Sequence, residues 1–168
     1  EHPIFDPTAW DDNSQFWAIT TALANRVLTA EEKHGSAPDP YMIVRPETGG
    51  NNLEYAWHYL LGFGDSGHIY YGTASDFSFI PVVGGNIAAD YADAVLGQAG
   101  ELPDGFAETV PPTIWVPQRF PYNPGALNFG VAYKWTSWIY PTNFHVFTFV
   151  YDASGLSSVK LKYRTATG

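Results

Sequence analysis

The stretch Arg45-Pro46-Glu47-Thr48-Gly49-Gly50-Asn51-Asn52-Leu53-Glu54-Tyr55-Ala56-Trp57-His58 decides the expected fold, because it joins an apolar run to a polar turn and a helix. The preceding residues 41–44 are continuously apolar, as in a strand buried on both faces of a parallel sheet. The Gly-Gly pair marks a turn, and Asn52 is a suitable cap for the following helix. The stretch therefore predicts a strand–loop–helix unit, whose loop is of the kind where α/β proteins bind ligands.

The rest of the first hundred residues extends this unit. Helical spacing of apolar residues predicts a helix between a cap at Ser14 and a stop at Gly35, and another that opens at Asn86. Residues 68–71 resemble a second strand, which a small, polar segment follows at 72–76. Residues 1–100 are therefore predicted to form a strand–helix layer with about three helices.

Residues 101–168 differ in character. An acidic, Pro-rich linker covers residues 98–113, and no helical period follows it. Five runs predict strands, so the segment is expected to be β-rich and sandwich-like; these are residues 114–116, 131–133, 138–140, 144–151 and 159–163. Seven strands are needed for an immunoglobulin-like sandwich, so the segment is either packed on the α/β part or continued in a further domain. The chain as a whole is predicted to be mixed α/β, and two alternatives stay open: a unit that folds by itself, or a fragment of a larger protein.

The amino-acid composition argues against some classes of function and favours others. The chain has 17 acidic and 8 basic side chains and a net charge of −9, which argues against nucleic acid as a partner. Aromatic residues make up 17% of the chain, more than a core needs, and exposed rings can stack on sugars or proteins. There is no Cys and no apolar run of about 18 residues, so neither disulfides nor a membrane span is predicted. The acidic balance with few Lys favours a secreted protein.

Two carboxylates are candidates for catalysis. Glu47 and Asp76 follow the two predicted strands, and the ends of neighbouring parallel strands share one edge of a sheet. Glycoside hydrolysis uses two carboxyl groups, of which one donates a proton and the other attacks or activates water. Alternatively, Asp76 caps a turn and Glu47 is solvated. Glu54 and His58, one helical turn apart, are either a proton-transfer unit or a surface pair.

The same loop offers groups that bind sugar hydroxyls, with an aromatic face beside them. Candidate substrate contacts here are Arg45, Asn51, Asn52, Trp57 and His58. The simpler alternative pairs Arg45 with Glu47 and leaves Asn52 as a helix cap. A second candidate surface, with alternating Pro and aromatic residues at 117–125, adds Trp115, Arg119 and Trp138. It is either a sugar platform or a strap between domains.

No cofactor or metal is predicted. The five His residues lack the helical spacing of a zinc pair, and the acidic residues 6–13 lack the pattern of a calcium loop. A nucleophile elbow is absent, and Gly84-Gly85-Asn86 lacks the Lys of a phosphate-binding loop.

Three stretches, residues 45–59, 111–125 and 147–164, carry a resemblance to a known class of protein. Together with the hairpin Asp152-x-Ser154-Gly155-Leu156-x-Ser158-Val159, they resemble the region of large secreted polysaccharide-acting enzymes where a catalytic barrel passes into sandwich modules. Proteins similar to family-57 glycoside hydrolases are the nearest match. The resemblance implies the carboxyl-terminal part of such an enzyme, with a polysaccharide or oligosaccharide as partner, and transfers no catalytic residue.

The prediction is therefore a carbohydrate-active, extracellular protein, part of a glycoside hydrolase. Two alternatives stay open. One is a non-catalytic carbohydrate-binding module or lectin. The other is a structural subunit of an extracellular assembly, since the hairpin at 144–164 leaves a strand edge that a neighbouring chain can join.

Overall fold

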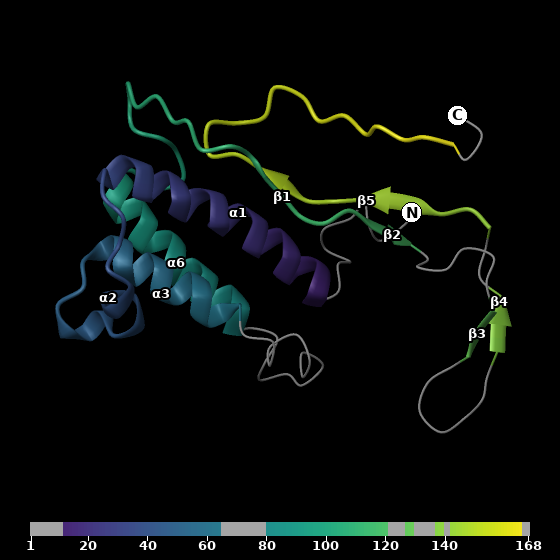
Figure 1. Cartoon of the computed structure of the whole chain (residues 1–168), viewed down its shortest axis with the longest axis horizontal. Coiled ribbons are helices and arrows are strands. Elements are labelled where there is room, and N and C mark those ends of the chain that lie inside the picture. The colour runs from purple at the N-terminus through teal and green to yellow at the C-terminus, as the bar shows by residue number, and fades with distance from the viewer. Residues whose placement is uncertain (1–11, 65–79, 121–126, 130–136, 140–141, 166–168) are drawn as a thin grey trace.

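The computed structural model describes residues 12–64, 80–120, 127–129, 137–139 and 142–165 (Figure 1). Its helical elements are α1 (Asp12–His34), α2 (Pro40–Val44), the 3₁₀ turn η3 (Pro46–Thr48), α3 (Asn52–Phe63) and α6 (Ile80–Leu96). Its strands are β1 (Thr113–Ile114), β2 (Gln118–Phe120), β3 (Leu127–Phe129), β4 (Ser137–Ile139), β5 (His145–Phe147) and β6 (Val150–Tyr151). None of the described helices is long and apolar enough to cross a membrane.

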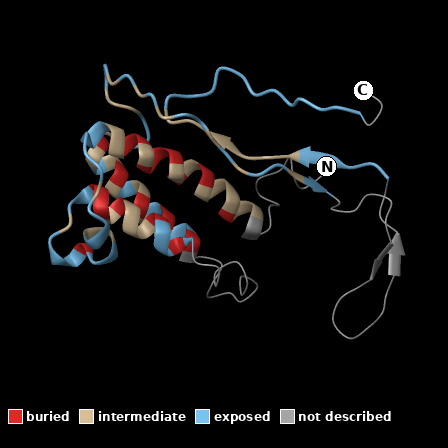
Figure 2. Cartoon of the chain, in the orientation of Figure 1, coloured by how far each residue is buried: buried red, intermediate tan, exposed pale blue. Residues whose placement is uncertain are grey.

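The core lies between α1, α3 and α6, whose inward faces are buried (Figure 2). Small side chains let the helices approach closely, and larger ones fill the remaining space. The buried apolar residues are Phe16, Leu23, Val27 and Ala30 of α1, Leu53, Ala56, Leu60 and Phe63 of α3, and Ala88, Ala92 and Leu96 of α6. The apolar periodicity of α1 and α3 predicts these two helices correctly.

The glycine pair Gly84-Gly85 lies inside α6, where it makes room for the other two helices. A Cβ on Gly84 would lie 2.9 Å from the Cβ of Phe63, and one on Gly85 would lie 2.9 Å from Ile19 Cγ2. The predicted start at Asn86 is therefore too late by six residues. Glycine usually interrupts helices, but here packing outweighs that preference, and Pro81 suits the first turn of a helix.

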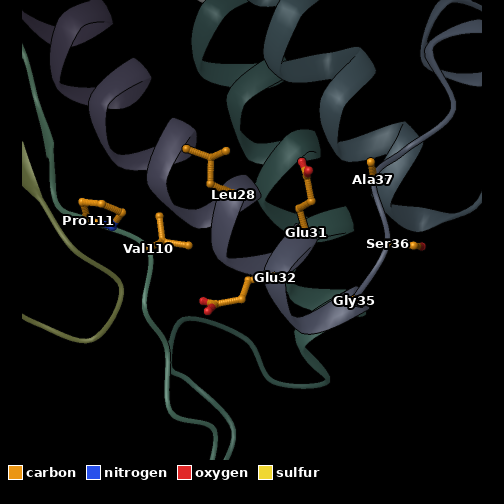
Figure 3. A pocket seen from close by; sticks show the side chains of 8 residues that line it. All are labelled: Leu28, Glu31, Glu32, Gly35, Ser36, Ala37, Val110 and Pro111. Atoms are coloured by element: carbon orange, nitrogen blue, oxygen red, sulfur yellow. The ribbon is translucent and has the colours of Figure 1, made fainter.

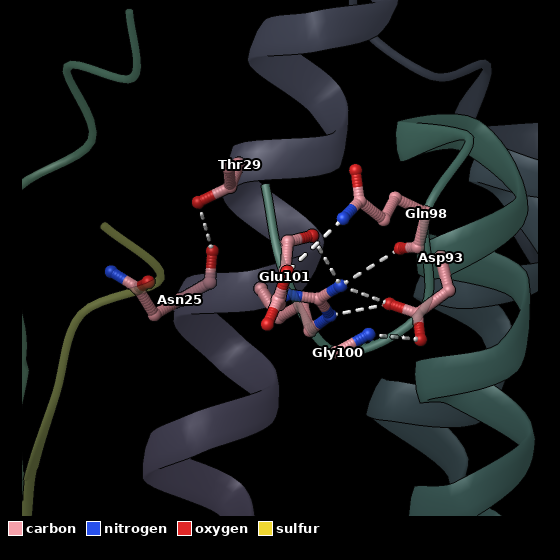
Figure 4. A network of polar contacts seen from close by, with 7 residues as sticks. Asn25, Thr29, Asp93, Gln98, Gly100 and Glu101 are labelled. Atoms are coloured by element: carbon pink, nitrogen blue, oxygen red, sulfur yellow. Dashed lines mark hydrogen bonds and ion pairs between the residues drawn. The ribbon is translucent and has the colours of Figure 1, made fainter. Parts of the chain in front are cut away.

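A partly buried ion pair fixes the turn that follows α6 (Figure 4). The guanidinium of Arg26 pairs with Asp93, and its Nη2 donates to the carbonyl oxygens of Gln98 and Glu101 at 3.2 Å each. Asp93 Oδ2 also accepts from the backbone N–H of Gly100 at 3.1 Å. The network holds the chain against α1 as it leaves α6. The predicted boundary at residue 100 falls in this turn, and the division into two domains stays a prediction.

The strands form three separate two-stranded sheets, all antiparallel. In β1–β6, Thr113 lies opposite Tyr151, and in β2–β5, Arg119 lies opposite Val146. Between these two pairings, Trp115 N–H donates to the carbonyl of Phe149 at 2.9 Å. Figure 1 shows the resulting ribbon running beside α1. The side of the ribbon next to α1 includes Trp115, whose ring stacks on Trp17 at 5.9 Å.

The predicted parallel layer is wrong at residues 41–44, which are helical. Asp39 accepts from the N–H of Tyr41 at 2.8 Å, and Pro40 occupies the first turn, so both favour a helix start. Tyr41 is 60% exposed and Val44 is 69% exposed, so this apolar run is not buried. The predicted strand at 68–71 lies outside the described residues. The chain is mixed α and β, with its described strands in short antiparallel ribbons.

The predicted strand at 159–163 is not formed, and the described strands do not build a sandwich. Residues 156–165 are exposed along their whole length. The turn before them does form as predicted: Gly155 has a φ of 92°, and Asp152 Oδ1 accepts from Ser154 N–H at 2.8 Å. The predicted strand at 131–133 lies outside the described residues, and residues 138–140 correspond to β4.

Replacing Gly84 by Ala tests the close approach of α6 to α3. We expect Gly84→Ala to lower the free energy of unfolding by about 1–3 kcal/mol, because Phe63 Cβ is part of the rigid helix and cannot move aside. The matched control is Gly62→Ala in α3, where an added Cβ meets nothing within 4 Å. This control should raise stability by about 0.4–1 kcal/mol, and urea denaturation measures both. Equal effects of the two substitutions would contradict the packing role.

Candidate functional site

The turn before α3 is held by a capping box. Asn51, rather than the predicted Asn52, caps the helix, and its Oδ1 accepts from Leu53 N–H at 2.8 Å. Glu54 Oε2 accepts from Asn51 N–H at 2.7 Å, and Glu54 Oε1 accepts from Asp39 N–H at 3.1 Å. The buried Glu54 carboxylate therefore joins the start of α2 to the start of α3. Both of its oxygens serve this structural role.

The Gly-Gly pair of the opening stretch makes this turn compact. Gly49 has a φ of 129°, and the N–H of Gly50 donates to the carbonyl of Pro46 at 2.7 Å. A Cβ on Gly50 would lie 2.9 Å from Pro46 Cα, so a side chain does not fit there. The sequence predicts the turn correctly, and the structure adds the contact that requires glycine at its second position.

His58 and Trp57 connect α3 to its neighbours. His58 Nδ1 donates to the carbonyl of Ile43 in α2 at 2.8 Å, and Trp57 Nε1 donates to Glu31 Oε2 in α1 at 2.9 Å. Neither bond involves Glu54, so the proposed proton-transfer unit of Glu54 and His58 is not formed. The predicted sugar contacts of Trp57 and His58 stay predictions, and both side chains are half-buried.

Arg45 and Glu47 are exposed before the Gly-Gly turn, and Asn52 is exposed as the first residue of α3. Their side chains make no hydrogen bond or ion pair with any described residue, so the predicted pairing of Arg45 with Glu47 is absent. Glu47 lies in η3 rather than at the end of a strand, which removes the sheet edge that motivated its pairing with Asp76. Asp76 lies outside the described residues, and the catalytic pair stays a prediction.

The second predicted surface does not join this loop. Trp115 is half-buried against Trp17, Arg119 is exposed in β2, and Trp138 lies in β4 opposite Asn128. Figure 1 shows β2 and β4 far from α2. Any role of these three residues in binding is therefore separate from that of Arg45 and Asn52.

Some of the many aromatic side chains pack against one another between helices. Tyr91 of α6 stacks on Tyr55 at 4.7 Å and on Tyr59 at 5.9 Å, both from α3. Stacked rings of this kind stabilise a helix interface beyond their buried area. Tyr41, in contrast, is an exposed ring that the sequence assigned to a buried strand.

A pocket of about 390 Å³ lies where the ends of three helices meet, and we call it the Asn52 pocket. Its lining combines the end of α1, the start of α3 and one residue of α6: Lys33, His34, Asn51, Asn52 and Val95. Lys33 Nζ lies 5.3 Å from the centroid of the Phe106 ring, and His34 Nδ1 lies 3.0 Å from Ser36 Oγ. The pocket thus brings two predicted substrate contacts, Asn51 and Asn52, next to a cation.

A second pocket of about 450 Å³, the Glu32 pocket, lies between the last turns of α1 and the segment at Val110 and Pro111 (Figure 3). Its lining includes Leu28, Val110 and Pro111 on the apolar side, and Glu31 and Glu32 on the polar side. The two carboxylates point in different directions, so they do not face one another across a shared substrate bond.

The carboxylate of Glu32 binds the linker. It accepts hydrogen bonds from Thr109 N–H at 2.9 Å and from Thr109 Oγ1. These bonds, the side-chain bond first, lower the pKa of Glu32 below its ordinary value of 4.5. A proton donor in glycoside hydrolysis needs the opposite shift, so Glu32 is not suited to that role.

No three His, Asp or Glu side chains within the described ranges are grouped so that they could hold a metal ion. The lining residues Lys33, Glu31 and Glu32 are not among the candidate site residues that the sequence predicts. Their place beside pockets depends on how α1 packs against α3 and against the linker. The periodicity of a single helix does not contain this information.

Comparison with known proteins finds a protein of similar sequence that is much longer than this chain. The chain is 31% identical over 163 residues to a protein named alpha-amylase from Niallia circulans. The match covers 92% of this chain and 12% of that protein, so the chain spans a small part of its relative. No family model matches the chain, and no solved structure matches it. The resemblance to family-57 enzymes stays a prediction.

The bond between Glu32 and Thr109 predicts a dependence of stability on pH. Because the folded-state pKa of Glu32 is lowered, its contribution is present above the unfolded-state pKa and is lost as pH falls through the folded-state value. We expect Thr109→Val to be less stable than the wild type at pH 7, and this difference to shrink as pH falls below about 4. Urea denaturation at several pH values measures it.

The control for this series is Thr142→Val, at an exposed threonine that no described residue contacts by a hydrogen bond. Its stability should follow that of the wild type at every pH. An NMR titration of Glu32 provides a direct check, since its pKa should rise in Thr109→Val. An unchanged titration curve would show that Thr109 does not lower the pKa.

Proposed function

We propose that this chain is part of an extracellular, polysaccharide-acting enzyme, and that its own share of the activity is to bind sugar. The observation that carries the proposal is the sequence match to an alpha-amylase, which extends through 92% of the chain. An α-linked glucan is accordingly the first candidate ligand. The match covers only 12% of the relative, so the activity of the whole enzyme is attributed to it and not to this chain alone.

The Asn52 pocket supports sugar binding by its chemistry. Sugar hydroxyls both donate and accept hydrogen bonds, and a side-chain amide does the same with one oxygen and one NH₂ group. The amide of Asn52 is exposed and makes no hydrogen bond with the described residues, so it is available to a ligand. Lys33 adds a donor, and Val95 adds an apolar contact for a ring face. A volume of about 390 Å³ lies within the usual range for small-ligand sites.

The alternative is hydrolysis by Glu47 with Asp76. Two carboxyl groups must flank the scissile bond, and the one that donates a proton usually lies in a water-poor setting. Glu47 lies on an exposed turn without a described partner, and the carboxylates of the Glu32 pocket diverge. These features favour binding over cleavage, and an assay for released reducing sugar compares the two directly. If the isolated chain hydrolyses glucan, and if Glu47→Gln abolishes this hydrolysis, the chain is catalytic and the binding proposal is wrong.

Calorimetric titration with a short α-glucan tests the proposal. We expect measurable binding to the α-glucan and weaker binding to a β-glucan or a galactan of equal length. Asn52→Ala should weaken binding about tenfold, which corresponds to the loss of roughly one hydrogen bond or two. Because Asn52 is not the cap residue, thermal stability should be unchanged.

The matched control is Asn86→Ala, which removes an exposed asparagine of α6 that does not line the Asn52 pocket. It should bind the glucan as the wild type does. If no sugar of the panel gives a signal, the chain does not bind polysaccharide on its own. If Asn52→Ala and the wild type bind equally, the site lies elsewhere, and Trp115 and Trp138 become the next residues to replace.

A further inference from the structure

Residues 158–164 form an exposed segment with two chemically different sets of side chains. Val159 is 62% exposed, Leu161 is 68% exposed and Tyr163 is 85% exposed. Lys160, Lys162 and Arg164 alternate with them. Successive side chains of a strand point to opposite faces, so this pattern would give an apolar face and a basic face once the segment is extended.

The backbone of this segment has no partner in the described protein. No residue from 156 to 165 makes a hydrogen bond with another described residue, and Figure 1 shows the segment as a trace that runs apart from the strands. Its start, in contrast, is fixed. Ala153 N–H donates to the buried Asn25 at 2.7 Å, and Asp152 closes the turn onto Ser154. An anchored segment with free N–H and C=O groups is suited to pair with another strand.

The charge of the segment is opposite to that of the rest of the chain. Lys160, Lys162 and Arg164 are three of the eight basic residues, and removing them from the net charge of −9 leaves −12 for the remainder. Three basic side chains are too few for the larger cluster of Lys and Arg that binding to nucleic acid needs, so nucleic acid is disfavoured. An acidic polypeptide strand can contact the basic face locally, since charges beyond about 10 Å are screened at physiological salt.

We propose that residues 159–163 pair, as an added strand, with an acidic edge strand of a separate β-sheet domain. Backbone hydrogen bonds would supply the pairing, the apolar face would continue the partner's apolar face, and carboxylates would lie opposite the basic side chains. This inference goes beyond sugar binding and does not depend on it.

The described strands of a second copy of this chain do not offer such a strand. Self-pairing of the segment would bring Lys and Arg opposite Lys and Arg, which is destabilising. None of the six described strands, β1 to β6, contains Asp or Glu. The acidic partner is therefore a different sheet.

The test uses a short synthetic peptide in which glutamate and valine alternate, titrated into the full chain and followed by ¹⁵N NMR. We expect the amide signals of residues 159–163 to shift and their hydrogen exchange to slow, and affinity to fall as salt is raised. The double variant Lys160→Glu/Lys162→Glu should lose at least tenfold in affinity, and should gain affinity for a peptide of alternating lysine and valine.

Leu161→Pro separates strand pairing from simple charge attraction. It keeps every basic residue but removes one N–H, so it should abolish the slowed exchange and weaken binding at least tenfold. Because the segment is exposed, folding of the helices should be unaffected, which far-UV circular dichroism checks. The proposal is overturned if the acidic peptide does not bind, if Leu161→Pro binds it as well as the wild type, or if sedimentation shows that the segment instead joins two copies.

Discussion

The amide of Asn25 is the interaction on which the arrangement of this protein depends. It is fully buried in α1, and it bonds to both segments that enclose the β1–β6 pairing. Its Nδ2 donates to the carbonyl of Pro111 at 3.1 Å, and its Oδ1 accepts from Ala153 N–H at 2.7 Å. Without it, the carbonyl of Pro111 and the N–H of Ala153 would lose their protein partner, at a cost of about 0.5–1.5 kcal/mol each.

This joint links the helices to the Glu32 pocket and to the segment that we propose pairs with another strand. Just before Pro111, the linker passes Thr109, which binds Glu32, and Val110 and Pro111 form one wall of the Glu32 pocket. On its far side, the turn at Ala153 sets the point from which residues 158–164 extend. The Asn52 pocket lies where the start of α3 meets the ends of α1 and α6. It depends on the packing of the helical core and not on the amide of Asn25.

The sequence predicted α1 and α3 because their apolar spacing, caps and stops agree with one another, as at Gly35, whose φ is 78°. It mistook residues 41–44 for a strand, because a short apolar run has no period and Asp39-Pro40 is a better helix start than its neighbours suggest. It placed the start of α6 late, because the glycine pair serves tertiary packing. Of the residues that line the Asn52 pocket, it named Asn51 and Asn52 as candidate contacts but not Lys33, whose proximity arises only when three helices meet.

The central claim, that Asn25 holds the ribbon to the helices, is tested most directly by hydrogen exchange in Asn25→Ala. The amides of Trp115 and Ala153 should exchange much faster than in the wild type, while those of Val27 and Leu53 in the helical core keep most of their protection. Equal acceleration at all four positions would show that helices and ribbon unfold as one unit. Unchanged exchange at Trp115 and Ala153 would show that the ribbon does not depend on this amide.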